Sequence, residues 1–276
     1  MDRTTTTLVI GGTGKTGRRI VHGLTGRHHP VRIGSRSAGL PFDWDAPATW
    51  APALEGVDAA YITFQPDLAV PGAAAAIGEL AHLAVDSGVR RLVLLSGRGE
   101  PEAEKAELAL SESGADWTVL RASWFDQNFS ESYLLDPVLD GRLALPAGTV
   151  PEPFVDADDI ADVAVAALTE DGHAGRTYEL TGPRALTFAD VAAEISAAAG
   201  RPVDYLPLTP TEFAAELTQA GVPAEVVELL VYLFTTVLDG RNERPADGVQ
   251  RALGREPRDF SDFARRTATT GVWNQR

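Results

Sequence analysis

The chain has 276 residues and carries 39 acidic against 24 basic side chains, which gives a formal net charge of −15 at pH 7. This excess of negative charge repels phosphate backbones and anionic headgroups, so we expect neither nucleic acid nor a membrane as a partner. The absence of cysteine excludes disulfides, thiolate metal sites and thiol catalysis. The five histidines lack the spacing of metal ligands, so no metal is expected.

The length exceeds that of most single compact domains, so we expect one nucleotide-binding domain with an appended lobe. The polar N-terminal residues run directly into a predicted strand, which argues against a signal peptide. No apolar segment approaches the roughly 18 residues of a membrane span. These features predict a cytoplasmic protein that acts on a small-molecule substrate.

The first predicted strand, Leu8–Ile10, leads into three glycines spaced G-x-x-G-x-x-G and then into an amphipathic helix. A turn of this kind gathers free backbone N–H groups and about half a positive charge where a pyrophosphate binds. Gly11 permits the sharp turn, Gly14 lets a phosphate approach the backbone, and Gly17 lets the helix pack on the strand. A Walker A loop is the first alternative, but it needs a glycine where Val9 stands. A glycine turn without a ligand is the second.

The second predicted strand, Val31–Ser35, ends in Ser35-Arg36-Ser37. NAD-preferring proteins carry an acidic residue at this strand end, where it holds the ribose 2′-hydroxyl. An arginine there can instead bind a 2′-phosphate through charge-assisted hydrogen bonds worth about 1.5–3 kcal/mol each. Ser35 and Arg36 therefore predict NADP(H) in preference to NAD(H). The alternative is a solvated loop arginine.

The next segment, Phe42–Trp50, predicts a short strand followed by a helical turn that begins near Pro47. At this place the Asp43 carboxylate can accept a hydrogen bond from an adenine amino group while Trp44 packs beside the ring. The alternative interpretation is a surface acid beside a buried tryptophan. The sequence leaves both open.

Strands then alternate with helices through the first two thirds of the chain. This order predicts an α/β fold with a doubly wound parallel Rossmann sheet and right-handed crossovers. The further predicted strands are Val57–Thr63, Arg91–Leu95, Trp117–Arg121 and Arg176–Thr181, with helices over Pro71–Val85 and Glu100–Ser113. The acids of the latter helix are expected on a solvated face; they are Glu100, Glu102, Glu104 and Glu107.

The remaining segments predict a smaller, mainly helical C-terminal substrate lobe. Residues 122–150 are rich in aromatic and turn residues, as is typical of a loop that lines a pocket rather than of a sheet. The helix predicted over Pro223–Leu238 is apolar around most of its circumference, so another surface must cover it, and a homodimer through the C-terminal helices is one expectation. We predict an NADP-binding domain of residues 1–121 plus 154–182, and a substrate lobe of residues 122–153 plus 183–276.

Several motifs in this order resemble those of the NmrA-like, atypical short-chain dehydrogenase/reductases. Within that family they are similar to the bacterial relatives of the fungal ergot-alkaloid reductases, which reduce an iminium intermediate. The motifs are GGTGKTG from Gly11, Val31-Arg32-x-x-Ser35-Arg36, Gly56-Val57-Asp58-Ala59, Leu94-Leu95-Ser96, Ser113-Gly114 before Trp117–Arg121, Trp124-Phe125-x-x-Asn128-Phe129, Phe154-Val155-Asp156-x-x-Asp159-Ile160-Ala161 and Tyr178–Gly182.

The resemblance implies a bound NADP(H) and an aromatic substrate pocket. The residues implied to hold the cofactor are Gly11, Thr13, Gly14, Lys15, Thr16, Gly17, Ser35, Arg36 and Asp43. The nicotinamide is expected between the strand ends Phe64–Gln65 and Ser96–Gly97. The pocket is expected to be covered by Trp124, Phe125, Asn128, Phe129 and Phe154, together with the C-terminal helices.

One departure from the wider superfamily concerns the proton donor. Its members typically use Tyr-x-x-x-Lys, and no tyrosine here has a lysine four residues later. Two catalytic candidates remain. Lys105 lies in the helix after the strand that bears Ser96, and Ser96 can donate to a substrate oxygen. The alternatives are a solvated Lys105 beside Glu102 and Glu104, and a Ser96 that bonds only backbone or cofactor.

Hydride transfer to an already activated acceptor tolerates a missing acid. The sequence therefore predicts an NADPH-dependent oxidoreductase that acts on a small conjugated, quinone- or imine-type substrate. One alternative is a non-catalytic regulatory protein that senses NADP(H). Another is a non-redox isomerase or cyclase on the same fold.

Overall fold

The computed structural model describes residues 5–274, which form two compact units. The first, here called the sheet unit, contains the described residues up to Ala122, Ala157–Leu180 and Asp247–Arg255. The second, here called the helical unit, contains Ser123–Asp156, Thr181–Ala246 and the described residues from Glu256 onward. Each unit is therefore built from three separate stretches of chain.

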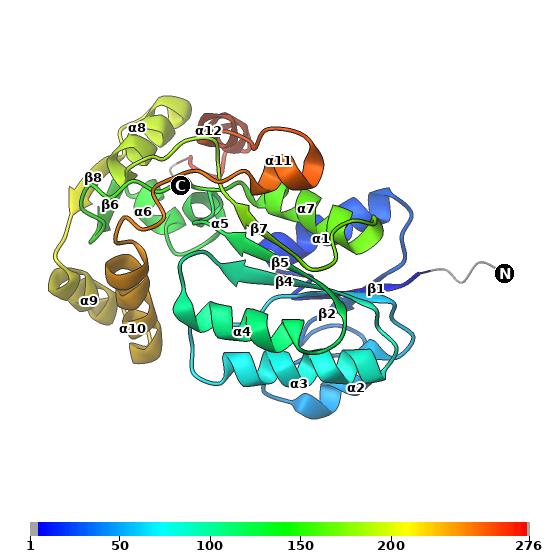
Figure 1. Cartoon of the computed structure of the whole chain (residues 1–276). Helices are drawn as coiled ribbons and strands as arrows, with labels where there is room; N and C mark the ends of the chain where they lie inside the picture. The colour runs from blue at the N-terminus through cyan, green and yellow to red at the C-terminus, as the bar shows by residue number, and fades with distance from the viewer. Residues whose placement is uncertain (1–4, 275–276) are drawn as a thin grey trace. The chain divides into compact units, whose positions relative to one another are not determined.

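The sheet unit is organised around six parallel strands (Figure 1). In spatial order they are β2 (Val31–Gly34), β1 (Thr7–Ile10), β3 (Ala59–Ile62), β4 (Arg91–Gly97), β5 (Asp116–Ala122) and β7 (Arg176–Leu180). From β1 the chain first adds β2 on one side and then crosses over to add β3, β4, β5 and β7 on the other side. The boundary between β1 and β3 is therefore a topological switch point, and open α/β sheets bind ligands at such points, beyond the carboxyl ends of the strands. This arrangement confirms the predicted doubly wound Rossmann sheet.

Helices cover both faces of this sheet, and Figure 1 shows α1 and α7 on one face and α3 and α4 on the other. The layers explain the sequence pattern, because a strand covered on both faces is apolar throughout. All four residues of β1 and of β3 are buried. The helices are α1 (Lys15–Gly26), α2 (Trp50–Leu54), α3 (Ala73–Asp86), α4 (Pro101–Ser111), α7 (Ala157–Thr169) and α11 (Gly248–Leu253), with a short 3₁₀ turn over Pro47–Thr49.

The helical unit packs its helices around a cluster of phenylalanine and leucine side chains. Its elements are α5 (Asn128–Glu131), α6 (Leu135–Leu139), β6 (Arg142–Leu145), α8 (Phe188–Ala199), β8 (Asp204–Pro207), α9 (Pro210–Gln219), α10 (Ala224–Tyr232), a π-helical turn (Leu233–Val237) and α12 (Phe260–Thr269). A capping box begins α8: the Thr187 side chain accepts from the Asp190 backbone N–H, and the Asp190 carboxylate accepts from the Thr187 backbone N–H.

Three predictions about elements differ from the structure. The predicted pocket loop over residues 122–150 contains a strand, β6, which pairs in parallel with β8. The segment Phe42–Trp44 forms no strand, because its backbone folds into turns held by Thr49 and Trp50. The segment Phe154-Val155-Asp156 predicts a short strand before α7, and the structure has there only an isolated bridge between Phe125 and Val155.

A fourth difference concerns the domain boundary. We predicted the whole of residues 183–276 in the lobe, but Asp247–Arg255 belongs to the sheet unit, where α11 packs against α7 and β7. Gly248 makes this possible, because a Cβ added there would lie 2.1 Å from the Glu179 carbonyl oxygen. The absence of a side chain lets two backbones meet, and no local periodicity reveals such an approach.

No helix within residues 5–274 combines the length and the apolar character that a membrane crossing requires.

Candidate functional site

The glycine turn after β1 has the geometry of a phosphate-binding loop. Gly11 adopts a left-handed φ of 69°, and its N–H donates to the Gly34 carbonyl oxygen at 2.8 Å. A Cβ on Gly17 would lie 2.1 Å from the Gly11 carbonyl oxygen, so α1 packs directly on the turn. Gly14 precedes the first residue of α1, and no side chain of the described residues caps that helix end. Uncapped N–H groups at a helix start fit an anionic pyrophosphate.

A buried tyrosine fixes the first turn of α1. The Tyr61 hydroxyl, on β3, donates to Thr16 Oγ1 at 2.9 Å, and both residues are buried. Burial raises the pKa of Tyr61 well above its usual range, so the phenol keeps its proton and remains a donor. Thr16 is thereby held against the sheet. Sequence reasoning did not find Tyr61, since in a buried strand it looks like a core residue.

The end of β2 lies beside this turn because the Gly11–Gly34 bond joins them. The Ser35 carbonyl oxygen accepts from the backbone N–H groups of Ala38 and Phe42, which closes a loop. Arg36 is exposed on that loop, and Ser35 Oγ lies 3.4 Å from Ser37 Oγ. The loop thus presents a guanidinium and hydroxyl groups where the ribose of a dinucleotide is expected.

Asp43 and Trp44, the residues predicted to contact the adenine, belong to an aromatic cluster near the carboxyl ends of β2 and β3. Trp44 Nε1 donates to the Thr63 carbonyl oxygen at 3.1 Å, and its ring lies 4.8 Å from that of Phe64. The Asp43 backbone is held by Trp50 Nε1 at 2.8 Å, and Asp43 Oδ1 accepts from the Asp45 N–H at 3.1 Å. The structure therefore brings Asp43 and Phe64, which are far apart in the sequence, to the same edge of the sheet.

Two carboxyl groups meet after β3 and β4. Glu100 and Asp67 are hydrogen-bonded to each other, and Asp67 Oδ1 also accepts from the Ala69 N–H at 2.8 Å. Burial and the nearby Asp67 charge raise the pKa of Glu100 to about 8, so Glu100 carries the proton at neutral pH. Its carboxyl group occupies the space above Gly97, where a Cβ would lie 2.1 Å from Glu100 Oε1. Glu100 is buried, which corrects the prediction that it lies on a solvated face.

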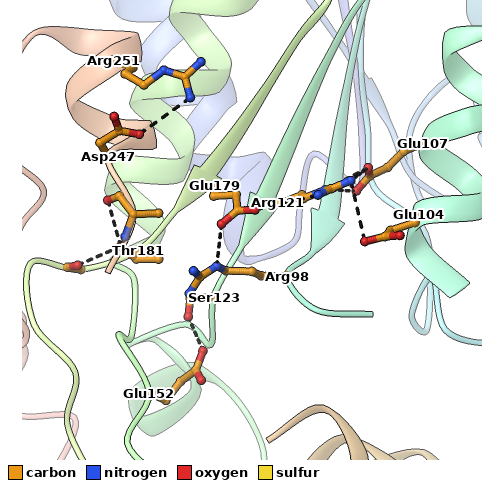
Figure 2. A network of polar contacts seen from close by, with 12 residues as sticks. Arg98, Glu104, Glu107, Arg121, Ser123, Glu152, Glu179, Thr181, Asp247 and Arg251 are labelled. Carbon is orange, nitrogen blue, oxygen red and sulfur yellow. Dashed lines mark hydrogen bonds and ion pairs between the residues drawn. The ribbon is translucent and has the colours of Figure 1, made fainter. Parts of the chain in front are cut away.

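The ends of β4 and β5 are tied to α4 through a second carboxylate, that of Glu107, and Figure 2 shows its contact with Arg121 of β5. Ser96 Oγ donates to Glu107 Oε1 at 2.6 Å. Arg121, on β5, donates to the same carboxylate from Nε at 2.9 Å and from Nη2 at 2.6 Å. Glu107 is 7% exposed, so the prediction of a solvated face is wrong for this residue also. A carboxylate can be buried here because Arg121 supplies the opposite charge.

The same network continues to β7 (Figure 2). Arg98 Nε donates to Glu179 Oε2 at 3.0 Å, and Arg121 Nη1 lies 3.9 Å from Glu179 Oε1. The Arg98 backbone N–H also donates to the Ala122 carbonyl oxygen at 3.0 Å. Two arginines and two glutamates therefore fasten the carboxyl ends of β4, β5 and β7 to one another.

Solved structures with this architecture include Citrobacter sp. triphenylmethane reductase complexed with NADP(H), with a TM-score of 0.79 and 20% identity, over 95% of this chain and 99% of that one. They also include NmrA, a negative transcriptional regulator, with a TM-score of 0.75 and 18% identity, over 98% and 97%. At such identities the likeness shows the fold.

Sequence relatives decide the family. The profile of an NAD(P)H-binding family matches residues 11–171. The uncharacterized oxidoreductase YesF of Bacillus subtilis is 33% identical, over 97% of this chain and 98% of the relative. Agroclavine dehydrogenase of Claviceps fusiformis is 31% identical, over 98% and 99%. The chain belongs to this NAD(P)H-binding family, together with these oxidoreductases. A further relative is the NAD(P)H azoreductase of Xenophilus azovorans, 31% identical over 94% of this chain and 96% of that one.

The two catalytic candidates of this oxidoreductase lie in different surroundings. The Ser96 hydroxyl already donates to Glu107, so donation to a substrate would require that bond to break. Lys105 is exposed on α4. Both roles stay predictions. Gln65 and Thr13 are exposed, and Lys15 and Gly97 are half-buried, at the strand and helix ends where we expect the cofactor.

The predicted substrate residues of this oxidoreductase all lie in the helical unit. Trp124 is half-buried, with its ring 4.6 Å from that of Phe234. Phe125 and Asn128 are half-buried, and the Asn128 N–H donates to the Phe125 carbonyl oxygen at 3.0 Å. Phe129 and Phe154 are buried among other rings, which places these two in the core of the unit. Their aromatic composition alone could not separate pocket from core.

Proposed function

We propose that this oxidoreductase prefers NADPH to NADH and reduces a small conjugated, quinone- or imine-type substrate. The observation that supports the cofactor preference is the exposed Arg36 at the end of β2, beside the uncapped glycine turn. No acidic residue occupies the Ser35-Arg36-Ser37 loop where a ribose 2′-hydroxyl would be held. A guanidinium favours the doubly charged 2′-phosphate instead.

The proposed substrate class follows from the lack of an evident side chain that could donate a proton to the substrate. The sequence has no Tyr-x-x-x-Lys, and the Ser96 hydroxyl is engaged by Glu107. When bound, the nicotinamide supplies a hydride, and an acceptor that is already electrophilic needs little protonation before it arrives. The residues of the chain then contribute mainly by binding and orienting. The names of the relatives, an azoreductase and a dehydrogenase of agroclavine, support such acceptors.

The cofactor preference is tested by calorimetry with NADPH and NADH on the wild type and on Arg36→Asp. We expect the wild type to bind NADPH at least ten times more tightly than NADH. The variant should lose at least tenfold in NADPH affinity, about 1.4 kcal/mol, because the carboxylate repels the 2′-phosphate. Arg90→Asp, at an exposed site just before β4 and so at the edge of the sheet opposite the strand carboxyl ends, controls for the general loss of positive charge. Equal NADPH affinity in Arg36→Asp and wild type would overturn the preference.

The reaction is tested by following NADPH oxidation at 340 nm with a panel of quinones, enones, azo compounds and imines. Turnover with at least one class is expected. Binding of NADPH without turnover across the panel would overturn the proposed activity and favour the regulatory alternative. In that case, a strong difference between the affinities for NADP⁺ and NADPH is the property that a redox sensor requires.

A further inference from the structure

Glu107 is a carboxylate that α4 directs at the ends of two strands rather than at solvent. It accepts from Ser96 near the end of β4 and from Arg121 near the end of β5. Ser96 and Arg121 are themselves register partners across the two strands. The Glu107 side chain therefore holds two directly paired residues of β4 and β5, close to the carboxyl ends of both strands.

The topology indicates what these strand ends face. The glycine turn, Arg36 and Asp43 follow β1 and β2, so the adenosine and phosphate half of a dinucleotide belongs on that side of the switch point. A dinucleotide bound to a Rossmann sheet crosses the switch point along the carboxyl edge. The next strands in spatial order after β3 are β4 and β5, so the nicotinamide half belongs at their ends.

We propose that Glu107 is a positioning residue for the nicotinamide half of the cofactor, acting through Ser96 and Arg121. This inference rests on the proposed function, because it concerns where an NADPH-dependent reductase holds its reactive ring. The carboxylate touches neither the adenosine side of the edge nor the glycine turn. Its loss should therefore disturb ring orientation far more than cofactor affinity.

The helix that carries Glu107 does not need this carboxylate in order to dock. Ala103, Ala106 and Leu110 of α4 are each fully buried, and they form its apolar contact with the sheet unit. A neutral amide at position 107 keeps the shape and can still accept a hydrogen bond from Ser96. It loses the negative charge and one acceptor oxygen, so the two-point ion pair with Arg121, the stronger part of the network, is broken.

The test compares wild type, Glu107→Gln and the matched control Glu104→Gln. Glu104 stands one turn earlier on α4, is exposed, and lies 3.9 Å from Arg121 Nη2. Three quantities are measured: the Kd of NADPH, kcat with the best acceptor, and the transfer of deuterium from NADPH labelled on one or the other face of C4. We expect Glu107→Gln to keep its Kd within about twofold, to lose about tenfold in kcat, and to transfer from both faces. Glu104→Gln should match the wild type in all three.

Two results would overturn the inference. One is a Glu107→Gln enzyme with unchanged kcat and strict facial selectivity. The other is a parallel loss of NADPH affinity and thermal stability, which indicates a purely structural role. If Glu107→Gln does not fold, Ser96→Ala removes one bond and leaves the Arg121 pair intact. It should lower kcat by about threefold at constant Kd, and an unchanged kcat there contradicts the inference.

The fluorescence lifetime of bound NADPH gives a readout that needs no turnover. Its value depends on how rigidly the nicotinamide is held. We expect a different lifetime in Glu107→Gln and an unchanged one in Glu104→Gln. Should the wild type turn over no acceptor, the proposed function fails while this comparison still decides the role of Glu107. Equal lifetimes in all three proteins would refute that role.

Discussion

The two ends of the carboxyl edge in the sheet unit are built in different ways. At the β1–β2 end, the edge is built from backbone: glycines, a helix start that no side chain within residues 5–274 caps, and a hydrogen bond between the Gly11 N–H and the Gly34 carbonyl oxygen. At the β4–β5 end, it consists of side chains, with Glu107 joining Ser96 to Arg121. A backbone site depends on which positions lack a Cβ, whereas a side-chain network depends on charges that meet from distant segments.

The largest effect is expected at the backbone end. Gly17→Ala places a Cβ 2.1 Å from the Gly11 carbonyl oxygen and 2.8 Å from Gly12 Cα, and none of these backbone atoms can move aside cheaply. We expect a loss of about 3 kcal/mol in the free energy of unfolding and a rise in the Kd of NADPH of at least about 100-fold. Chemical denaturation and calorimetry measure the two quantities.

The control for this change is Gly26→Ala at the other end of the same helix. A Cβ there would meet nothing within 4 Å, so stability and NADPH affinity should remain near the wild-type values. If Gly17→Ala bound NADPH normally, close packing of α1 on the turn would not be what forms the site.

The second largest effect is expected when the side-chain network at the β4–β5 end is broken. Arg121→Met leaves the buried Glu107 carboxylate without its partner guanidinium, which is expected to cost about 3 kcal/mol in the free energy of unfolding. Arg142→Met removes an arginine whose pair with Glu216 is exposed, at 49% and 46% of the two side chains. That change should cost at most about 1 kcal/mol. Similar losses in the two variants by urea denaturation would contradict the comparison.

The smallest effect is expected in the pH dependence of stability, through the buried Glu100 carboxyl group. The ordinary pKa of Glu100 is 4.5, and in the folded protein it is raised to about 8 by burial, Asp67 and Glu102. Between these values the folded state holds a proton that the unfolded state has lost, so this group lowers stability as pH rises. Glu100→Gln cannot ionise and still donates to Asp67. It should exceed the wild type by about 1–3 kcal/mol at pH 8, with the difference disappearing towards pH 4.5.

Thermal denaturation across this pH range measures the effect. Glu112→Gln, an exposed residue after α4, should show the same pH profile as the wild type. A Glu100→Gln profile parallel to that of the wild type would mean that Glu100 is ionised in the folded protein.

The same contrast explains what the sequence could predict. The glycine turn and the alternation of strands and helices are local patterns, and they gave the Rossmann sheet and the NAD(P)H-binding family. Glu100 and Glu107 were placed on a solvated face because their neighbours on α4 are acidic. Their burial depends on Asp67 and Arg121, which lie on other elements, and a single helix contains no information about either.

Close packing between two backbones also could not be predicted from the sequence. Gly248 gave no periodic signal, yet it is the position that lets α11 lie against β7. The strand pair β6–β8 joins segments separated by α7, β7 and α8. The cofactor residues remain predictions based on position, since what the structure shows is the loop geometry around them.

The return of α11 to the sheet unit has a consequence for how the protein is made. A ribosome releases Asp247–Arg255 only after most of the helical unit has left the exit tunnel. The surface that α11 covers on α7 and β7 therefore stays open while Thr181–Ala246 is synthesised, although every strand of the six-stranded sheet has already been made. Synthesis that stops before Gly248 yields a nascent sheet unit in which this surface of α7 and β7 is uncovered, and incompletely packed species of this kind are prone to aggregate.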